Sequence, residues 1–129
     1  NHDLIARAER ACYTYSSVKN LPPVWRDGVF RRVDETYCLK ADYQRRVSFE
    51  CADLRNSVPG ETFDLILCRN LVFTYFDSAL QKAVGKRLVD ALKPCGVLIT
   101  GVHEVPPADL AGLEAWSQRL AIYRKVLRG

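Results

Sequence analysis

Polar side chains that can bind a small molecule follow three apolar runs of the sequence. They are Asp53 with Leu54, Arg69 with Asn70, and His103 with Glu104. Carboxylate, guanidinium, amide and imidazole groups can orient a ligand by accepting or donating hydrogen bonds. Ligands of open parallel sheets bind outside the carboxyl ends of the strands, so we expect these side chains to converge on one edge. An aromatic and acidic patch, Tyr75-Phe76-Asp77, follows closely.

Each of these residues also has a purely structural interpretation. Asp53 can cap a turn, as short acidic side chains often do, and Arg69 with Asn70 can satisfy exposed backbone groups at a strand end. His103 has no partner at ligand spacing besides the adjacent Glu104, so a hydrogen-bonded structural role is favoured over a catalytic base. Tyr75 and Phe76 can be core residues, and for Phe76 that interpretation is preferred.

Several motifs that would indicate other chemistry are absent from the sequence. No two glycines form G-x-G, and Gly96 and Gly101 have P-loop spacing but are followed by Val102 instead of lysine. A dinucleotide loop and a Walker motif are therefore excluded. The sequence also lacks a G-x-S-x-G elbow and any cluster with zinc spacing, so no metal site is predicted.

The composition is that of an ordinary globular protein. The chain has 129 residues, of which 48% are apolar and 26% charged, so one folded domain over residues 1–129 is predicted. The net charge of +4 is spread along the chain. It suits an acidic protein partner and does not require nucleic acid. No apolar stretch is long enough to span a membrane.

The cysteines favour a reducing environment. Their number is five, which is odd, no two form C-x-x-C, and most lie in apolar runs. These features predict reduced thiols, no disulfide framework and a cytoplasmic location. The chain starts at Asn1 in what already resembles the inside of a helix, which suggests a fragment.

The hydrophobic pattern predicts a mostly parallel α/β sheet with flanking helices. Helices are predicted over residues 3–12, 24–30, 77–92 and 107–116, and strands over residues 36–39, 46–51, 63–68, 96–102 and 120–127. The runs FDLILC and GVLITGV are apolar on both faces, which is typical of buried parallel strands. The amphipathic helix between them, with Asp77 as its N-cap, completes a βαβ unit.

The order of these segments resembles the CheR-type (chemotaxis-receptor) methyltransferases. FDLILCRN, then TYFD, a helix and LKPCGVLITGVHE are similar to that family's strand ending in C-R-N, its Y-F-D, its L-x-P-G-G and its strand ending in G-H-S-E. ARAERACY, YSSVKNLPPVWRDGVF and VSFECADL are similar to its earlier segments. The similarity covers nearly the whole chain, and the order and spacing of the pieces are more specific than any single piece.

The resemblance implies a partial Rossmann-like (class I) methyltransferase fold, with S-adenosylmethionine as the methyl donor and a protein glutamate carboxylate as the acceptor. By position, Asp53 and Leu54 match residues that meet the adenine. Arg69 and Asn70 match the C-R-N at the active-site strand end, and Tyr75 matches the Y-F-D tyrosine near the substrate.

The sequence departs from the family pattern in four places. Four residues, 71–74, separate C-R-N from Y-F-D, where the family usually has three. The G-H-S-E end reads Gly101-Val102-His103-Glu104, and P-G-G is shifted to Cys95-Gly96. The N-terminal half, which in the family carries the glycine-rich loop, an acidic residue for the ribose and a substrate arginine, has no counterpart.

Two other functions stay open. The chain can be a non-catalytic half-domain that binds partners or forms a homodimer through the sheet edge that the missing strands leave open, because unpaired edges invite pairing. It can also be a methyltransferase with a different acceptor, since fold does not fix function.

Overall fold

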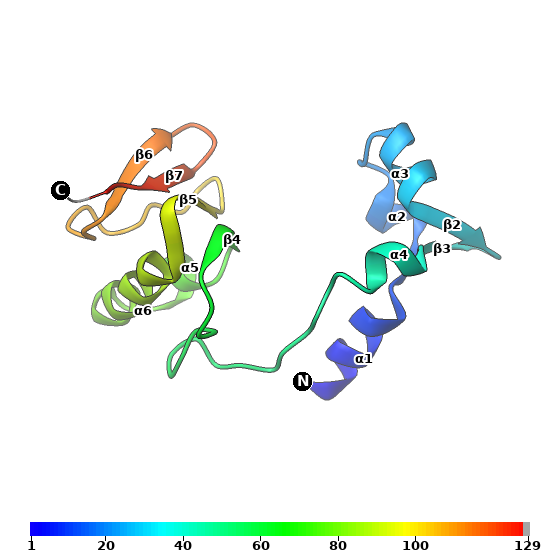
Figure 1. Ribbon diagram of the computed structural model, residues 1–129, viewed down its shortest axis with the longest axis horizontal. Coiled ribbons are helices and arrows are strands. Elements are labelled where there is room, and N and C mark those ends of the chain that lie inside the picture. Colours follow the sequence, from blue (N-terminus) through cyan, green and yellow to red (C-terminus); the bar gives the residue numbers. More distant parts are fainter. Residues whose placement is uncertain (128–129) are drawn as a thin grey trace. The chain divides into compact units, whose positions relative to one another are not determined.

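The computed structural model describes residues 1–127, which form two compact units (Figure 1). The first unit is Asn1–Cys51 and the second begins at Ala52. Each unit has its own β-sheet. The prediction of a single domain over residues 1–129 stays a prediction. Within residues 1–127, no helix combines the length and the apolar character that crossing a membrane requires.

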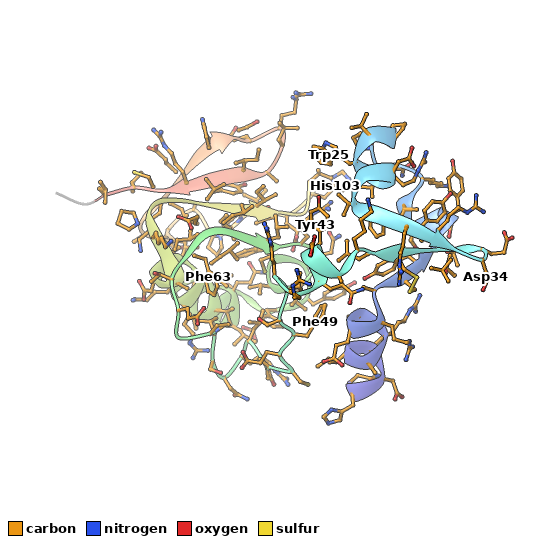
Figure 2. All side chains as sticks on the ribbon, turned by 45° about the vertical axis from the view of Figure 1, so that its right-hand side comes forward. Trp25, Asp34, Tyr43, Phe49, Phe63 and His103 are labelled. Atoms are coloured by element: carbon orange, nitrogen blue, oxygen red, sulfur yellow. A yellow bond between two sulfur atoms is a disulfide. The ribbon has the colours of Figure 1, made fainter. Side chains whose placement is uncertain are left out.

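The first unit is built on a three-stranded antiparallel sheet with the strand order β1-β3-β2. Its elements, in chain order, are α1 (His2–Arg10), β1 (Cys12–Thr14), α2 (Tyr15–Val18), α3 (Pro23–Val29), β2 (Phe30–Val33), β3 (Thr36–Leu39) and α4 (Ala41–Gln44). The helices predicted over residues 3–12 and 24–30 are confirmed by α1 and α3, and the strand over residues 36–39 by β3. Asp34 lies at the tip of the β2–β3 hairpin (Figure 2) with a φ of 54°, a left-handed conformation that short acidic side chains tolerate.

A disulfide joins Cys12 of β1 to Cys38 of β3. The two residues lie directly opposite one another in the antiparallel register. The prediction of no disulfide is therefore wrong, and the cysteines no longer argue for a reducing compartment. The two cysteines are 26 residues apart in sequence, and their pairing follows from the register of β1 against β3. No local sequence motif therefore predicts this disulfide. Cys51, Cys68 and Cys95 are free.

The second unit is an α/β unit with the strand order β4-β5-β7-β6. Its elements are β4 (Phe63–Cys68), α5 (Val72–Tyr75), α6 (Ser78–Ala91), β5 (Leu92–Thr100), β6 (Leu113–Ser117) and β7 (Ile122–Lys125). The α/β class is confirmed, but the sheet is mixed. The pair β4–β5 is parallel, whereas β5–β7 and β6–β7 are antiparallel. The chain can therefore return from β6 to β7 through a short connection, which parallel strands do not allow.

The predicted βαβ unit is confirmed by β4, α6 and β5. Asp77 caps α6, because its Oδ1 accepts a hydrogen bond of 2.9 Å from the backbone N–H of Leu80. The helix lies along one side of the sheet (Figure 1). The buried core combines residues from β4, α5, α6 and β5, namely Cys68, Val72, Phe73, Val84, Leu88, Leu92 and Leu98.

Two predicted elements are wrong. Residues 46–51 form no strand; they are exposed and lack a strand neighbour to pair with, and β-propensity alone does not hold an extended segment in place. Residues 107–116 form turns that lead into β6 instead of a helix. Gly112, with a φ of 89°, interrupts that segment, and β6 gains its hydrogen bonds from β7.

The disulfide makes the stability of the first unit sensitive to redox conditions. The hydrophobic side chains buried in this unit are Ala11, Val18 and Cys38, so its core is small. We expect that reducing Cys12–Cys38 costs about 3.5 kcal/mol of stability, by the loop-closure estimate for a sequence separation of 26 residues. Amide hydrogen exchange of β1–β3, with and without dithiothreitol, measures this effect. Cys51→Ser is the matched control, and equal exchange in both conditions would contradict the expectation.

Candidate functional site

The carboxyl ends of β4 and β5 lie side by side. Cys68 pairs with Thr100 at the end of the parallel register, so the residues that follow each strand emerge at the same edge. Arg69 and Asn70 follow β4, and Glu104 comes shortly after β5. The predicted convergence of these two groups is confirmed by hydrogen bonds between them.

Glu104 links these segments through its carboxylate. The side chain is buried, with 4% of its surface exposed. Its Oε1 accepts hydrogen bonds from the backbone N–H of Asn70 (2.5 Å) and of Gly101 (2.7 Å), and its Oε2 accepts one from the hydroxyl of Thr74 (2.9 Å). A buried carboxylate needs such donors, because an unpaired charge is costly to remove from water.

The pKa of Glu104 is set by two opposing effects. Burial raises the pKa, and the hydrogen bonds from Asn70, Gly101 and Thr74 lower it. Together the hydrogen bonds outweigh burial, so the pKa lies below the ordinary value for glutamate. The carboxylate is therefore ionised at neutral pH. Cys68, whose thiol is buried nearby, has a raised pKa chiefly because of its burial.

Arg69 and Leu54 line one cavity beside β4. Its volume is about 350 Å³, and most of its lining is apolar, including Val58, Leu65 and Leu71. Leu54 therefore lies near the end of β4, although the strand predicted directly before it does not form. Arg69 itself is exposed and supplies a guanidinium to the rim.

Asp53 takes part in a turn with Arg55. Its carboxylate accepts a hydrogen bond from the backbone N–H of Arg55 (3.0 Å) and is held by the guanidinium, with Oδ2 2.6 Å from Nη2. These side-chain and backbone hydrogen bonds lower the pKa of Asp53 to about 2. The geometry matches the turn-capping interpretation, and the adenine contact stays a prediction.

Tyr75 lies on the helical turn α5 and is 76% exposed. Three of the four residues between C-R-N and Y-F-D lie in this turn, and two of them, Val72 and Phe73, belong to the buried core. Thr74 then faces Glu104, and Tyr75 faces solvent. The adjoining Phe76 packs against the core, as preferred from the sequence.

The sequence analysis placed Glu104 with His103 among the polar residues at strand ends but did not distinguish the two, and it did not single out Thr74. His103, labelled in Figure 2, is exposed, and the buried position next to it is occupied by Glu104. No local signal separates the two, because His103 and Glu104 are adjacent polar residues and only the fold decides which of them is buried.

Comparison with known proteins identifies the family. The family profile described as "CheR methyltransferase, SAM binding domain" matches residues 1–118. The chain belongs to the CheR methyltransferase family. This membership is consistent with the strand end that carries Arg69 and Asn70.

Relatives in this family include named methyltransferases. The chain is 32% identical over 114 residues to the probable biofilm formation methyltransferase WspC of Pseudomonas aeruginosa, covering 86% of this chain and 27% of that protein. It is 31% identical over 109 residues to the chemotaxis protein methyltransferase of Escherichia coli, covering 79% of this chain and 37% of that protein. The chain thus spans between 27% and 37% of the length of these two relatives.

A solved structure with a related arrangement is the N-methyltransferase NodS from Bradyrhizobium japonicum in complex with S-adenosyl-L-homocysteine. The match has a TM-score of 0.46 and 19% identity, and it covers 65% of this chain and 58% of that chain. This likeness is too weak to support an argument about the site.

The cavity beside β4 fits part of S-adenosylmethionine, the cofactor in the family description. Its apolar lining suits the face of an adenine ring. The carboxylate of Asp53, next to Leu54 in the chain, is not part of this lining and is paired with Arg55. No acidic side chain lines this cavity, so the described residues offer it no carboxylate for the ribose hydroxyls or the sulfonium. The fit therefore extends to the adenine end.

The narrow space around Gly101 yields a test of this geometry. A Cβ added at Gly101 would lie 2.6 Å from Oε1 of Glu104 and closer still to Oδ1 of Asn70. We expect Gly101→Ala to lower the free energy of unfolding by about 1–3 kcal/mol, measured by urea denaturation. Gly60→Ala is the control, because a Cβ there meets nothing within 4 Å. Equal effects of the two changes would show that the strand ends are not packed as described.

Proposed function

We propose that this chain takes part in S-adenosylmethionine-dependent methyl transfer to the side-chain carboxylate of a protein glutamate. Family membership over residues 1–118 is the observation that carries the proposal. The relative from Escherichia coli named above, a chemotaxis protein methyltransferase, supports an acidic protein substrate, such as a receptor, and a cytoplasmic location. The net charge of +4 favours such a partner.

The reaction depends more on the alignment of methyl donor and acceptor than on a general base that deprotonates the acceptor. The cofactor supplies a methyl group on a sulfonium; an oxygen of the acceptor forms the new C–O bond while the C–S bond breaks and its electron pair stays on sulfur. A glutamate side chain has a reference pKa of about 4.3 and is already ionised at neutral pH. The protein must hold donor and acceptor in line and exclude water without protonating the acceptor.

The residues at the strand ends suit this task. Arg69 is exposed beside the cavity and can bind the acceptor carboxylate through paired hydrogen bonds. Tyr75 is exposed on α5 and can donate a hydrogen bond to the same carboxylate. Asn70 lies between them in the chain. Leu54 can pack on the adenine, and Asp53 can accept from its amino group.

Substitutions on the two sides of the site should have separable effects. We expect Asp53→Ala to weaken binding of S-adenosylhomocysteine about tenfold, which corresponds to one lost charged hydrogen bond. Tyr75→Phe should leave that affinity unchanged and lower kcat about tenfold. Calorimetric titration gives the affinities, and transfer of a labelled methyl group gives kcat.

The matched control for Asp53→Ala is Arg55→Ala. It breaks the same turn contact but leaves the carboxylate of Asp53 in place. If Asp53 accepts from the cofactor, Arg55→Ala retains binding. Equal losses in both variants would mean that Asp53 serves the turn alone.

A second candidate function is self-association through β4, as expected for a non-catalytic half-domain. In the described sheet β4 is an edge strand, paired with β5 on one side. Leu65 and Leu67 on its uncovered face are 51% and 64% exposed. Unpaired edges with apolar side chains favour pairing with another strand, here β4 of a second copy.

This candidate is tested by sedimentation equilibrium of the 129-residue chain. We expect a dimer fraction that rises with concentration and is lost in Leu65→Lys/Leu67→Lys, because charges on an edge strand oppose pairing. Leu120→Lys, which changes an exposed leucine outside β4, is the control. A monomer at all concentrations would exclude self-association.

A further inference from the structure

Glu104 carries a buried carboxylate that the proposed reaction does not use. We infer that Glu104 is a positioning residue, whose carboxylate holds the backbone of Asn70 and the helical turn that carries Tyr75 against the end of β5. The roles of Asn70 and Tyr75 rest on the proposed function. The contacts of Glu104 do not depend on it.

One oxygen of Glu104 joins the ends of two neighbouring strands. Oε1 accepts from Asn70, which follows β4, and from Gly101, which follows β5. The backbone ladder between these strands has its last pair at Cys68 and Thr100. Beyond that pair no backbone hydrogen bond of the sheet joins the segments that follow β4 and β5. The carboxylate of Glu104 joins them instead.

The second oxygen fixes the next segment. Oε2 accepts from the hydroxyl of Thr74, the residue before Tyr75 in α5. Tyr75 is 76% exposed, so little packing holds its own ring. Its position therefore depends on the turn beneath it, which is held by Val72 and Phe73 in the core and by Thr74 on Glu104.

The side-chain type at position 104 follows from these partners. All three groups donate to Glu104, and its ionised carboxylate accepts at both ends of its head group. The hydrogen bonds from Asn70, Gly101 and Thr74 favour the ionised form. Asp would be one methylene too short to reach donors on two segments. In Glu104→Gln, the amide oxygen can accept from the backbone N–H groups of Asn70 and Gly101. The amide NH₂ can donate to the hydroxyl of Thr74, which rotates to accept.

The first test compares Glu104→Ala with Glu104→Gln in the intact protein. Glu104→Ala should lower kcat about tenfold or more, because the backbone of Asn70 and the turn that carries Tyr75 lose the contact that holds them in place. The affinity for S-adenosylhomocysteine should change less than about twofold, since Asp53 and Leu54 meet the adenine. Glu104→Gln should restore most of kcat.

A purely structural role gives a different pattern. Loss of folded protein would lower the number of binding sites in the calorimetric titration and leave kcat per occupied site unchanged. That result, or a Glu104→Gln variant no better than Glu104→Ala, would overturn the inference.

The second test reads the contacts directly and needs no activity. The amide proton resonances of Asn70 and Gly101 should shift together as the pH falls from about 7 to about 3, with a midpoint below the ordinary range for glutamate. The shift should be absent in Glu104→Gln and unchanged in His103→Gln, which removes the adjoining imidazole. Independent or absent shifts would overturn the inference. If the wild-type protein neither binds S-adenosylhomocysteine nor transfers methyl groups, the proposed function fails, and this titration still decides the role of Glu104.

Discussion

The parallel pairing of β4 with β5 determines where the polar residues of this protein can meet. Parallel strands end at the same edge of a sheet, so the residues after Cys68 and after Thr100 emerge together. The crossover through α6 makes this pairing possible and covers one face with Val84 and Leu88. The antiparallel strands β7 and β6 then extend the sheet away from the site. Without the β4–β5 pair, Glu104 would lose the donors of Asn70 and Thr74 and keep the backbone N–H of Gly101 alone among these three.

Elements with local signals were predictable from the sequence, and elements that depend on distant partners were not. The apolar run FDLILC and the amphipathic helix capped by Asp77 carry local signals, and both elements form where predicted. The prediction that FDLILC is buried on both faces is wrong, because β4 is an edge strand of the described sheet and its Leu65 and Leu67 are exposed. Residues 46–51 have strand propensity but no neighbour, so they stay irregular. The disulfide depends on the register of β1 against β3, and β6 depends on β7. Neither dependence can be read from a window of residues.

The candidate site shows the same division. The position of Arg69 and Asn70 at a strand end followed from the apolar run before them, and Phe76 was rightly placed in the core. The identity of the buried residue after β5 did not follow, because His103 and Glu104 are adjacent and only the fold decides which one turns inward. The one-residue extension before Tyr75 was visible as a departure from the family pattern. The hydrogen bond from the hydroxyl of Thr74 to Glu104 depends on the geometry of α5, which the sequence does not show.

A carboxylate that is buried and fully engaged is suited to hold a site in shape before any ligand arrives. Methyl transfer to an ionised acceptor gains little from proton transfer, so alignment of donor and acceptor is where the protein can contribute most. Alignment is lost when supporting segments move by a fraction of an ångström, and strand ends and short helical turns are segments that can move. Three charged hydrogen bonds from Asn70, Gly101 and Thr74 restrain them at one point. Glu104 therefore acts on the reaction through the rigidity of its partners, without touching the reacting atoms.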